Sequence, residues 1–393
     1  MTVSRTSPYL VPGQWLGVLG GGQLGRMFCQ AAQDLGYQVA VLDPAAQGPA
    51  AAVADRHLQA AYDDEAALAQ LAGLCKAVTT EFENVPADSL RVLAEVSAVS
   101  PSGDAVAVVQ DRIAEKTFIA SQGIPVAPWA AIRSEADLEA APDALFPGIL
   151  KVARLGYDGK GQARVVNRQE ALAALAAFDG AACVLEALQP LDYEISVVLA
   201  RGHDGEIRIF PAARNEHRNG ILAVSEVGAS LDPAIQAQAH EAARTLAEGL
   251  DYRGVLCIEF FVLQDGRLLV NEIAPRPHNS GHYTMDACLT SQFEQQARVM
   301  AGLPLGDTSM TGAAIMLNLL GDIWFDPETD AVREPDWRTV LAIPGAKLHL
   351  YGKRDARKGR KMGHVNCVAP TLEQARAAAA AAARALGIVY DPA

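Results

Sequence analysis

The sequence predicts a mixed fold: a doubly wound α/β domain with a parallel sheet, then a larger α+β region, then a small third region. Strand and helix patterns alternate over residues 15–100, which is typical of parallel βαβ units. Later strand patterns adjoin through short turns, which indicates mostly antiparallel sheets. The stretch SPSGD at 100–104 separates the two patterns, so we expect domains at residues 1–110, 111–305 and 306–393.

The first region opens with a glycine pattern. An apolar run leads into Gly20, Gly22 and Gly25, spaced G-x-G-x-x-G, and Asp43 ends the next apolar run. This is the pattern of a dinucleotide-binding βαβ unit, so an NAD-dependent oxidoreductase is one hypothesis. The expected elements are strands at 15–20, 38–43 and 77–83 and helices at 22–36, 64–75 and 87–96.

The second and third regions hold the remaining elements. A helix pattern from residue 108 is stopped by Gly123 and Pro125, and a helix is expected at 232–250. Strands are expected on both sides of a glycine-rich loop within 146–166, and at 183–188, 194–201, 206–214, 254–263 and 267–274. The third region ends in an alanine-rich helix at 371–387, which we interpret as a thin structural helix packed close to a sheet.

Composition narrows the function classes. The net charge of -13 argues against a nucleic-acid-binding protein, which needs a basic face. The six cysteines are scattered and form no C-x-x-C, which favours reduced thiols in the cytoplasm over disulfides or zinc. No apolar run approaches the ~18 residues of a membrane span, and the first residues lack the apolar stretch of a signal peptide. We therefore expect a cytoplasmic protein with no nucleic-acid or membrane partner.

Two segments carry a pattern suited to phosphate and metal chemistry. KVARLGYDGKGQ at 151–162 is a glycine-rich loop whose backbone N–H groups could approach phosphate, although a solvated hairpin is the simpler alternative. In GVLCIEFFVLQDGRLLVNEI, a hairpin turn at Asp265-Gly266 would place Glu259 opposite Glu272. Facing carboxylates repel unless a cation lies between them, and oxygen ligands suit Mg²⁺. The alternative is that both glutamates point to solvent.

Two basic segments complete the candidate chemistry. APRPHNSGH follows Glu272 directly and brings Arg276, His278, Asn279 and His282 beside the expected metal, where an arginine can clamp a planar anion. YGKRDARKGRKMGH at 351–364 is a basic cluster in an acidic chain. Such a cluster is either a solvated face or a binding site for a phosphate monoester.

Together these features resemble the ATP-grasp superfamily, with an N-terminal doubly wound preATP-grasp domain, a central ATP-grasp domain of two α+β lobes and a small C-terminal domain. The segments GGGQLGRM, TTEFENVP, QDR, GYDGKGQ, NEIAPRPHNSGH and GRKMGH, in this order over about residues 15–368, look like the carboxyaminoimidazole ribonucleotide synthetase family of microbial purine biosynthesis. The resemblance implies carboxylation of aminoimidazole ribonucleotide by bicarbonate, through carboxyphosphate, with ATP and Mg²⁺ or Mn²⁺. It also implies a homodimer.

The resemblance further implies a role for each site residue. The residues implied for ATP are Arg112, Lys151, Gly156, Tyr157, Asp158, Gly159, Lys160, Gly161, Gln162, Glu186, Ala187, Leu188, Gln189, Glu194, His217, Asn271 and Glu272. Glu259 and Glu272 would hold the metal ion. Arg276, His278 and Asn279 would hold bicarbonate and act catalytically with Lys151 and with Asp158, which would face the substrate amine. Gln23, Leu24, Glu81, Lys353, Arg360 and Lys361 would bind the ribonucleotide, with Arg354 or Arg357 sharing the phosphate.

Two alternatives stay open beside this interpretation. Another ATP-grasp ligase, or the formate-dependent glycinamide ribonucleotide transformylase, would share ATP and Mg²⁺ but use a different acceptor. The NAD-dependent oxidoreductase would leave the glutamate hairpin and the glycine loop unexplained. With ATP assigned to residues 156–162, the opening glycine turn is free for the second substrate, and we interpret Asp43 as an ordinary acid at a strand end.

Overall fold

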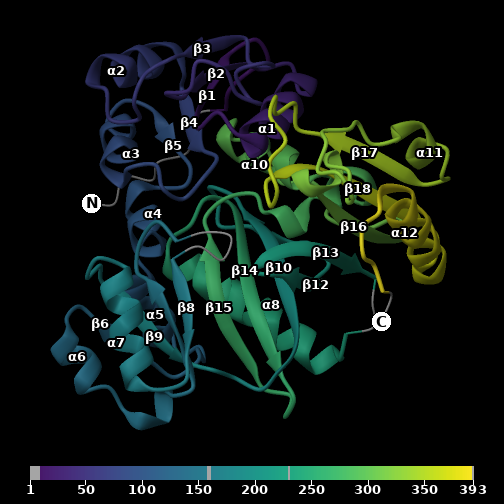
Figure 1. Ribbon diagram of the computed structural model, residues 1–393. Coiled ribbons are helices and arrows are strands. Elements are labelled where there is room, and N and C mark those ends of the chain that lie inside the picture. The colour runs from purple at the N-terminus through teal and green to yellow at the C-terminus, as the bar shows by residue number, and fades with distance from the viewer. Residues whose placement is uncertain (1–8, 157–160, 229–230, 392–393) are drawn as a thin grey trace.

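Three sheets organise the part of the chain that the computed structural model describes, residues 9–156, 161–228 and 231–391 (Figure 1). The first is a five-stranded parallel sheet at the N-terminal end. The second is a four-stranded sheet in a small lobe. The third is a nine-stranded, mostly antiparallel sheet that runs through the rest of the molecule. The predicted combination of α/β and α+β parts is therefore confirmed.

The N-terminal sheet has the doubly wound arrangement that the alternating pattern predicts. Its strand order is β3-β2-β1-β4-β5, and every pairing is parallel. The strands are β1 (Trp15–Leu19), β2 (Gln38–Leu42), β3 (Arg56–Leu58), β4 (Ala77–Thr80) and β5 (Ala98–Val99); the helices are α1 (Gln23–Asp34), α2 (Glu65–Leu74), α3 (Ala87–Ala94) and α4 (Gly103–Val109). α1 covers one face, while α2, α3 and α4 cover the other.

The small lobe folds around its own sheet, whose order is β6-β9-β7-β8. Its elements are α5 (Arg112–Ser121), β6 (Trp129–Ile132), α6 (Glu135–Glu139), β7 (Gly148–Val152), β8 (Gln162–Val165), α7 (Arg168–Ala177) and β9 (Cys183–Ala187). The predicted strands on both sides of the glycine-rich loop are present as β7 and β8, which pair directly. α6 and α7 lie where no helix was predicted.

The large sheet has the order β15-β14-β10-β12-β13-β16-β18-β17, with β11 paired to β10. Its strands are β10 (Leu191–Arg201), β11 (Ile207–Ile209), β12 (Ala213–Arg218), β13 (Ile221–Val227), β14 (Gly254–Leu263), β15 (Leu268–Ala274), β16 (Ala313–Leu320), β17 (Ala346–Leu350) and β18 (Lys361–Ala369). The sheet therefore runs across residue 305, where we expected one domain to end. The strand predicted at 206–214 is divided between β11 and β12.

Helices cover this sheet at both ends. α8 (Pro233–Gly249) buries Ile235, Ala239 and Leu246 against β10, β14 and β15. α12 (Leu372–Leu386) packs its alanines on β16 and β18, as predicted for the alanine-rich segment, and ends at Gly387 in the left-handed conformation. The remaining helices are α9 (Thr284–Ala287), α10 (Gln292–Met300) and α11 (Trp337–Leu341). No helix in the described part of the chain is long and apolar enough to cross a membrane.

Candidate active site

Two glutamates of the predicted hairpin face each other, although the strand register between them and the turn differs from the prediction. Near the turn the register is shifted by one residue, because Phe260 pairs with Val270 rather than with Asn271. A β-bulge between Glu259 and Phe260 then takes up Asn271 as an extra residue and restores the predicted pairing of Glu259 with Glu272. The carboxylate pair is thus confirmed, and it depends on the bulge.

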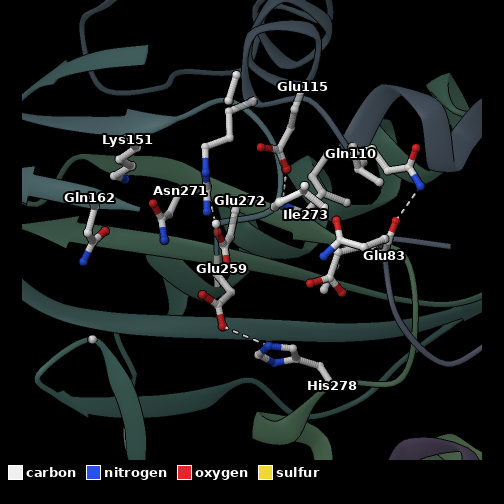
Figure 2. Close-up of a pocket in the computed structure, with 18 of the residues that line it drawn as sticks. Glu83, Gln110, Glu115, Lys151, Gln162, Glu259, Asn271, Glu272, Ile273 and His278 are labelled. Carbon is white, nitrogen blue, oxygen red and sulfur yellow. Dashed lines mark hydrogen bonds and ion pairs between the residues drawn. The ribbon is translucent and has the colours of Figure 1, made fainter. Parts of the chain in front are cut away.

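The bulge also brings a third oxygen donor to the pair. Asn271 lines the same cavity as Glu259 and Glu272, and Figure 2 shows the three side chains close together. The Oδ1 atom of Asn271 is buried and has no hydrogen-bond partner within the described residues. An unpartnered buried amide oxygen beside two carboxylates is a donor set that a ligand would complete.

The two carboxyl groups have opposite pKa shifts. Burial, together with the facing Glu272 carboxylate, raises the pKa of Glu259 from 4.5 to about 7. Burial acts in the same direction on Glu272, but the Arg112 guanidinium, together with the charge of Lys151, lowers the pKa of that carboxyl. Arg112 Nη1 lies 3.0 Å from Glu272 Oε2. Arg112 therefore keeps Glu272 ionised, while the repulsion between the two carboxylates appears as the raised pKa of Glu259.

This donor set fits a hard divalent cation. Mg²⁺ in proteins usually takes one or two carboxylates and completes its shell with water and substrate phosphate. Within the described ranges no group of three or more His, Cys, Asp or Glu side chains converges as a metal site. An ion at Glu259 and Glu272 would therefore need ligands from outside the protein, which is the arrangement expected for a metal that arrives with a nucleotide.

The pair lies in a cavity of about 320 Å³ at the junction of the small lobe, the large sheet and the N-terminal domain. The structure brings together many of the predicted nucleotide residues in its lining: Arg112, Lys151, Gly156, Gln162, Glu194, His217, Asn271 and Glu272. His217 Nδ1 lies 2.9 Å from Glu194 Oε2. Although burial opposes it, this contact raises the pKa of His217.

Lys151 is held in the cavity wall by a buried ion-pair cluster. Glu186 receives Lys151 Nζ on one oxygen and Lys116 Nζ on the other, each at 3.2 Å. Burial lowers the pKa of Lys151, and the Glu186 carboxylate opposes that shift. Two lysines around one glutamate leave the cluster with a net positive charge, which suits a phosphate-bearing ligand at Lys151.

A second cavity, of about 350 Å³, adjoins the first and opens toward the glycine turn. Gln23, Leu24 and Glu81, which the resemblance implies for the ribonucleotide, line it together with Asn279, which the resemblance implies for bicarbonate. Both cavities are lined by the same five residues at their junction: Glu83, Asn84, Arg276, His278 and Lys361. Three of these, Arg276, His278 and Lys361, are predicted site residues, so the junction is where two bound substrates would meet.

The glycine turn is occupied by carboxylates of the protein itself. Glu81 accepts hydrogen bonds from the N–H groups of Gly22 at 2.5 Å and Gly25 at 2.7 Å. Asp43 accepts from Gly21 N–H at 2.6 Å and from the Tyr62 hydroxyl at 2.6 Å. A Cβ at Gly22 would lie 2.4 Å from Glu81 Oε1, so the glycine is needed for this close approach. The groups that would bind a dinucleotide pyrophosphate and ribose are thus already engaged, which argues against the oxidoreductase.

Arg276, His278 and Asn279 lie at the junction and differ in charge and in hydrogen bonding. Arg276 Nε donates to Glu83 Oε2 at 2.6 Å, and His278 Nε2 lies 3.4 Å from Glu259 Oε1 (Figure 2). Burial, reinforced by the charges of Arg276 and Lys361, lowers the pKa of His278 well below its usual value, so its ring is neutral. The amide of Asn279 is buried, and neither of its polar atoms has a partner within the described residues. An amide in this state can donate to and accept from a polar ligand.

The structure separates the predicted phosphate-binding cations. Only Lys361 lines the cavities. Lys353 Nζ donates to the Lys361 carbonyl at 2.6 Å, and Arg360 Nη1 donates to the Asp355 carbonyl at 2.9 Å. Arg354 and Arg357 are exposed. A direct contact of Lys353 or Arg360 with the substrate phosphate therefore stays a prediction.

The remaining predicted residues either fall outside the described part of the chain or do not line these cavities. Tyr157, Asp158, Gly159 and Lys160 lie outside the described residues. Gly161, at a left-handed φ of 70°, follows them directly. Glu186, Ala187, Leu188 and Gln189 belong to β9 and its end but do not line either cavity. The N–H groups of Ala187 and Leu188 donate to the carbonyls of Pro128 and Pro147, so the adenine contact expected there stays a prediction.

Sequence reasoning missed several residues of the site. Glu83 and Lys116 are absent from the predicted set. Glu83 lies within TTEFENVP, and Lys116 lies four residues after the segment QDR, in QDRIAEK. Gln110, in the same segment as Arg112, donates to the carbonyls of Glu83 at 2.6 Å and Val85 at 2.5 Å. A usable signal was present for Lys116, because it lies on the buried face of an amphipathic helix, where an unpaired lysine is rare.

Comparison with family models divides the chain into three matches. Residues 14–110 match the ribonucleotide synthetase preATP-grasp domain, residues 117–293 the ATP-grasp domain, and residues 314–378 the phosphoribosylaminoimidazole carboxylase C-terminal domain. The predicted fold class, with these three parts in this order, is confirmed.

Known proteins are similar over nearly the whole chain. The N5-carboxyaminoimidazole ribonucleotide synthase of Brucella melitensis is 49% identical over 92% of this chain and 98% of its own, and that of Bacillus subtilis is 42% identical over 91% and 92%. Among solved structures, an N5-carboxyaminoimidazole ribonucleotide synthetase in complex with ADP superposes with a TM-score of 0.89 at 39% identity, covering 96% of this chain and 98% of that one. The Aspergillus clavatus synthase with ADP and 5-aminoimidazole ribonucleotide gives 0.85 at 31% identity, covering 95% and 99%.

Proposed function

The chain belongs to the family of N5-carboxyaminoimidazole ribonucleotide synthases, and from this premise we propose how its own residues carry out the family reaction. It is an ATP-grasp ligase of purine biosynthesis that carboxylates 5-aminoimidazole ribonucleotide at the expense of ATP. Of the alternatives raised by the sequence, neither the oxidoreductase nor the formate-dependent transformylase is retained.

The reaction divides between the two cavities. In the first cavity an oxygen of bicarbonate attacks the γ-phosphorus of ATP, and ADP leaves. The resulting carboxyphosphate breaks down to CO₂ and phosphate at the junction. The exocyclic amine of the ribonucleotide, bound in the second cavity, then attacks CO₂ and loses one proton. The labile intermediate survives only in a site that excludes water, which favours a junction walled by buried side chains.

ATP is assigned to the cavity at the small lobe. Lys151, held by Glu186, and the backbone around Gly156 and Gly161 would face the phosphates, and Arg112 supplies a further cation beside Glu272. Glu194 and His217, which also line this cavity, would contact the nucleoside. In such a site the protein contributes mainly position and charge, because phosphoryl transfer needs little covalent help.

Glu259, Glu272 and Asn271 are assigned to Mg²⁺, with Mn²⁺ as a substitute. When bound, the ion would neutralise the charge that develops on the transferred phosphoryl group. The support is the donor set itself: facing carboxylates with a raised pKa on one of them, and an unpartnered amide oxygen beside them.

Bicarbonate and the ribonucleotide are assigned to the junction and the second cavity. Arg276, His278 and Asn279 would hold bicarbonate and its phosphorylated form. Gln23 and Leu24 would contact the ribonucleotide, and Lys361, with Lys353 and Arg360 behind it, would carry the charge for its phosphate. Asp158 remains our proposed partner of the amine. The observation that carries the proposal is that two cavities share Arg276, His278 and Lys361.

An ADP-release assay tests the proposal. The full-length protein with ATP and Mg²⁺ is expected to release ADP much faster when aminoimidazole ribonucleotide and bicarbonate are both present than when either is omitted. Formate with glycinamide ribonucleotide serves as the comparison acceptor pair. Equal release with that pair, or release that ignores bicarbonate, would contradict the assignment of the junction.

Three further features are proposed with this function. The chain acts as a homodimer, which the family resemblance implies and sedimentation would test. It acts in the cytoplasm, which fits six cysteines that are all free thiols. Its parts 1–110, 111–305 and 306–393 act as a preATP-grasp domain, an ATP-grasp domain and a C-terminal domain, even though one sheet joins the last two.

A further inference from the structure

A buried chain of hydrogen bonds leads across three neighbouring strands to His278. It starts at Ser225 on β13 and continues through Asn215 on β12, Ser196 on β10 and Ser280 of the short 3-10 turn at Asn279–Gly281. Consecutive polar atoms are 2.7–2.9 Å apart. Each of these four residues is at least nine-tenths buried. The roles proposed above use none of them.

The direction of this chain follows from one backbone group. The N–H of Ser280 donates to Nδ1 of His278 at 3.3 Å. An amide N–H can only donate, so Nδ1 must present a lone pair. The ring proton of His278 is therefore on Nε2, and this assignment depends on no rotatable hydrogen.

Every earlier link then has only one direction. The Oγ of Ser280 is 2.8 Å from the unprotonated Nδ1, so its hydroxyl must donate there. Its own oxygen accepts from the hydroxyl of Ser196 at 2.7 Å. Because that hydrogen of Ser196 is used, Ser196 must accept in turn.

The amide of Asn215 supplies that donor and is oriented by doing so. Its Nδ2 donates to Ser196 Oγ at 2.9 Å, which leaves Oδ1 to accept from the hydroxyl of Ser225 at 2.8 Å. The amide of Asn215 is thus the one group in the chain that both donates and accepts through different atoms. Its orientation follows from the direction that the Ser280 N–H requires, and it supports that direction at the far end of the chain.

We propose that this chain fixes His278 as the Nε2–H tautomer and makes it a hydrogen-bond donor, not a proton acceptor, in the reaction centre. Nε2 faces Glu259, whose Oε1 is 3.4 Å away, at the junction of the two cavities (Figure 2). Resting on the proposed function, the acceptor during turnover is an oxygen of phosphorylated bicarbonate. No proton changes place: Nε2–H stays on the ring and stabilises negative charge on the anion.

In this proposal Asn215, Ser196 and Ser280 are positioning residues. In the Nδ1–H tautomer, Nε2 would present a lone pair instead of a proton. That lone pair would repel the oxygens of both Glu259 and the anion. A donor that is fixed before the substrate binds needs no reorganisation during the reaction. That preorganisation explains why polar side chains on three strands are buried behind a single imidazole.

The tautomer can be measured directly in the unmodified protein. Nitrogen-15 NMR of histidine-labelled protein separates protonated from unprotonated imidazole nitrogens, and comparison with His278→Gln assigns the resonances. The expected result is an unprotonated Nδ1 and a protonated Nε2. A protonated Nδ1 overturns the proposal, whatever the enzyme's activity.

Asn215→Asp tests the direction of the chain without touching the site. An aspartate has the same shape but no N–H, so Ser196 would turn to donate to residue 215 and Ser280 would turn to donate to Ser196. The Ser280 oxygen, at 2.8 Å, would then favour a proton on Nδ1 of His278 and oppose the longer contact of 3.3 Å from the Ser280 N–H. We expect the NMR signal of a protonated Nδ1, and a fall in kcat for bicarbonate-dependent ADP release of about tenfold or more. The KM for ATP should change by less than about twofold.

The matched control is Asn318→Asp. Asn318 is also buried in the large sheet and donates from Nδ2 to a backbone carbonyl, that of Leu222, but it is not in the chain. It should leave the tautomer of His278 unchanged. Equal effects of the two substitutions would show a general cost of burying a carboxylate and would overturn the proposal. NMR measures the tautomer without turnover, so the two proposals can fail separately. An Nε2–H ring in a protein whose ADP release does not depend on bicarbonate would refute the proposed function and leave the tautomer proposal standing.

Discussion

At the scale of single residues, Glu259 and Glu272 show how two identical side chains that face each other differ in their electrostatic surroundings. Only Glu272 has a guanidinium partner, so removing its charge breaks an ion pair, whereas removing the charge of Glu259 relieves repulsion. In the absence of Mg²⁺ at pH 8, we expect Glu259→Gln to stabilise the fold by about 1–3 kcal/mol. Glu272→Gln should destabilise it by about 1–2 kcal/mol, a modest value because the Glu272 side chain is 35% exposed.

Thermal unfolding of both variants checks this difference, and ADP release checks the metal assignment. Both substitutions should lower Mg²⁺-dependent ATP turnover by about a hundredfold or more, since each removes a proposed ligand. Stability changes of the same sign would contradict the electrostatic assignment. Near-normal turnover of either variant would contradict the metal site.

Glu115 predicts a pH dependence of stability. Its carboxylate accepts from Ile273 N–H at 2.6 Å, and burial raises its pKa from 4.5 to about 7. A raised carboxyl pKa contributes stability that is full below about pH 4.5 and is lost as the pH rises through 7. Glu115→Gln keeps the acceptor without the charge. The free energy of unfolding of Glu115→Gln, relative to that of the unmodified protein, should therefore be higher at pH 8 than at pH 5 by on the order of 2 kcal/mol.

Denaturant unfolding at both pH values measures this gain. The exposed Glu241 on α8 provides the control, because Glu241→Gln should show the same difference from the unmodified protein at pH 5 and pH 8. A gain for Glu115→Gln that does not change with pH would contradict the raised pKa.

The site residues that sequence reasoning found share a short segment or a hairpin. Glu259 and Glu272, or Arg276 and His278, are related by local spacing, and local spacing is legible in a sequence. The residues that it missed depend on distant partners: Glu83 meets Arg276 across 193 positions, and Lys116 meets Glu186 across 70. No pattern in the sequence names the partner in such a contact, because the contact is set by tertiary packing: within the small lobe for Lys116, and between domains for Glu83.

At the scale of elements, α10 shows why a buried helix can escape prediction. Its Gln292, Gln295 and Gln296 are buried as completely as core leucines, because their amides pair with the backbone of other segments. The apolar stripe of α10, formed by Phe293, Ala297 and Met300, is short, and the three buried glutamines beside it look like an exposed polar face in the sequence. α7, with small residues on every side, escaped for a related reason, whereas the alternating pattern of the first domain was read correctly.

Two of these glutamines give a matched pair of variants. Gln292 pairs with both the N–H and the carbonyl of His278, each at 2.8 Å, and Gln295 pairs in the same way with Gly306 at 3.0 and 2.8 Å. Replacing either by methionine leaves two buried backbone groups unpaired, so both should lose about 1–3 kcal/mol of stability. Only Gln292→Met should raise the KM for bicarbonate, by about tenfold, because it frees the backbone of His278.

Steady-state kinetics and unfolding of both variants separate the two effects. The KM for ATP serves as an internal control and should stay close to normal in both. If Gln295→Met raised the KM for bicarbonate as much as Gln292→Met, the effect would follow from lost stability. The proposed positioning of the junction by α10 would then be wrong.

At the scale of the whole molecule, the hydrophobic cores do not follow the order of the chain. The core on one face of the N-terminal sheet combines residues from 10–77 with Phe293, Ala297, Met300 and Tyr351. The core of the small lobe, in contrast, is drawn entirely from residues 132–187. The N-terminal sheet should therefore be coupled to α10 and the C-terminal part, while the small lobe should be a cooperative unit of its own.

Native-state hydrogen exchange distinguishes the two kinds of core. Leu150→Ala removes a fully buried side chain from the small lobe and should lower its opening free energy by about 3 kcal/mol, with protection elsewhere unchanged. Phe293→Ala creates a cavity of similar energetic effect between α10 and the N-terminal sheet. Because that core is shared, protection should fall in β1 and β2 as well as in α10, more than 200 positions away in the sequence. Loss of protection confined to α10 would mean that the N-terminal sheet is stable without it. The junction of the two cavities would then be assembled from independently folded parts.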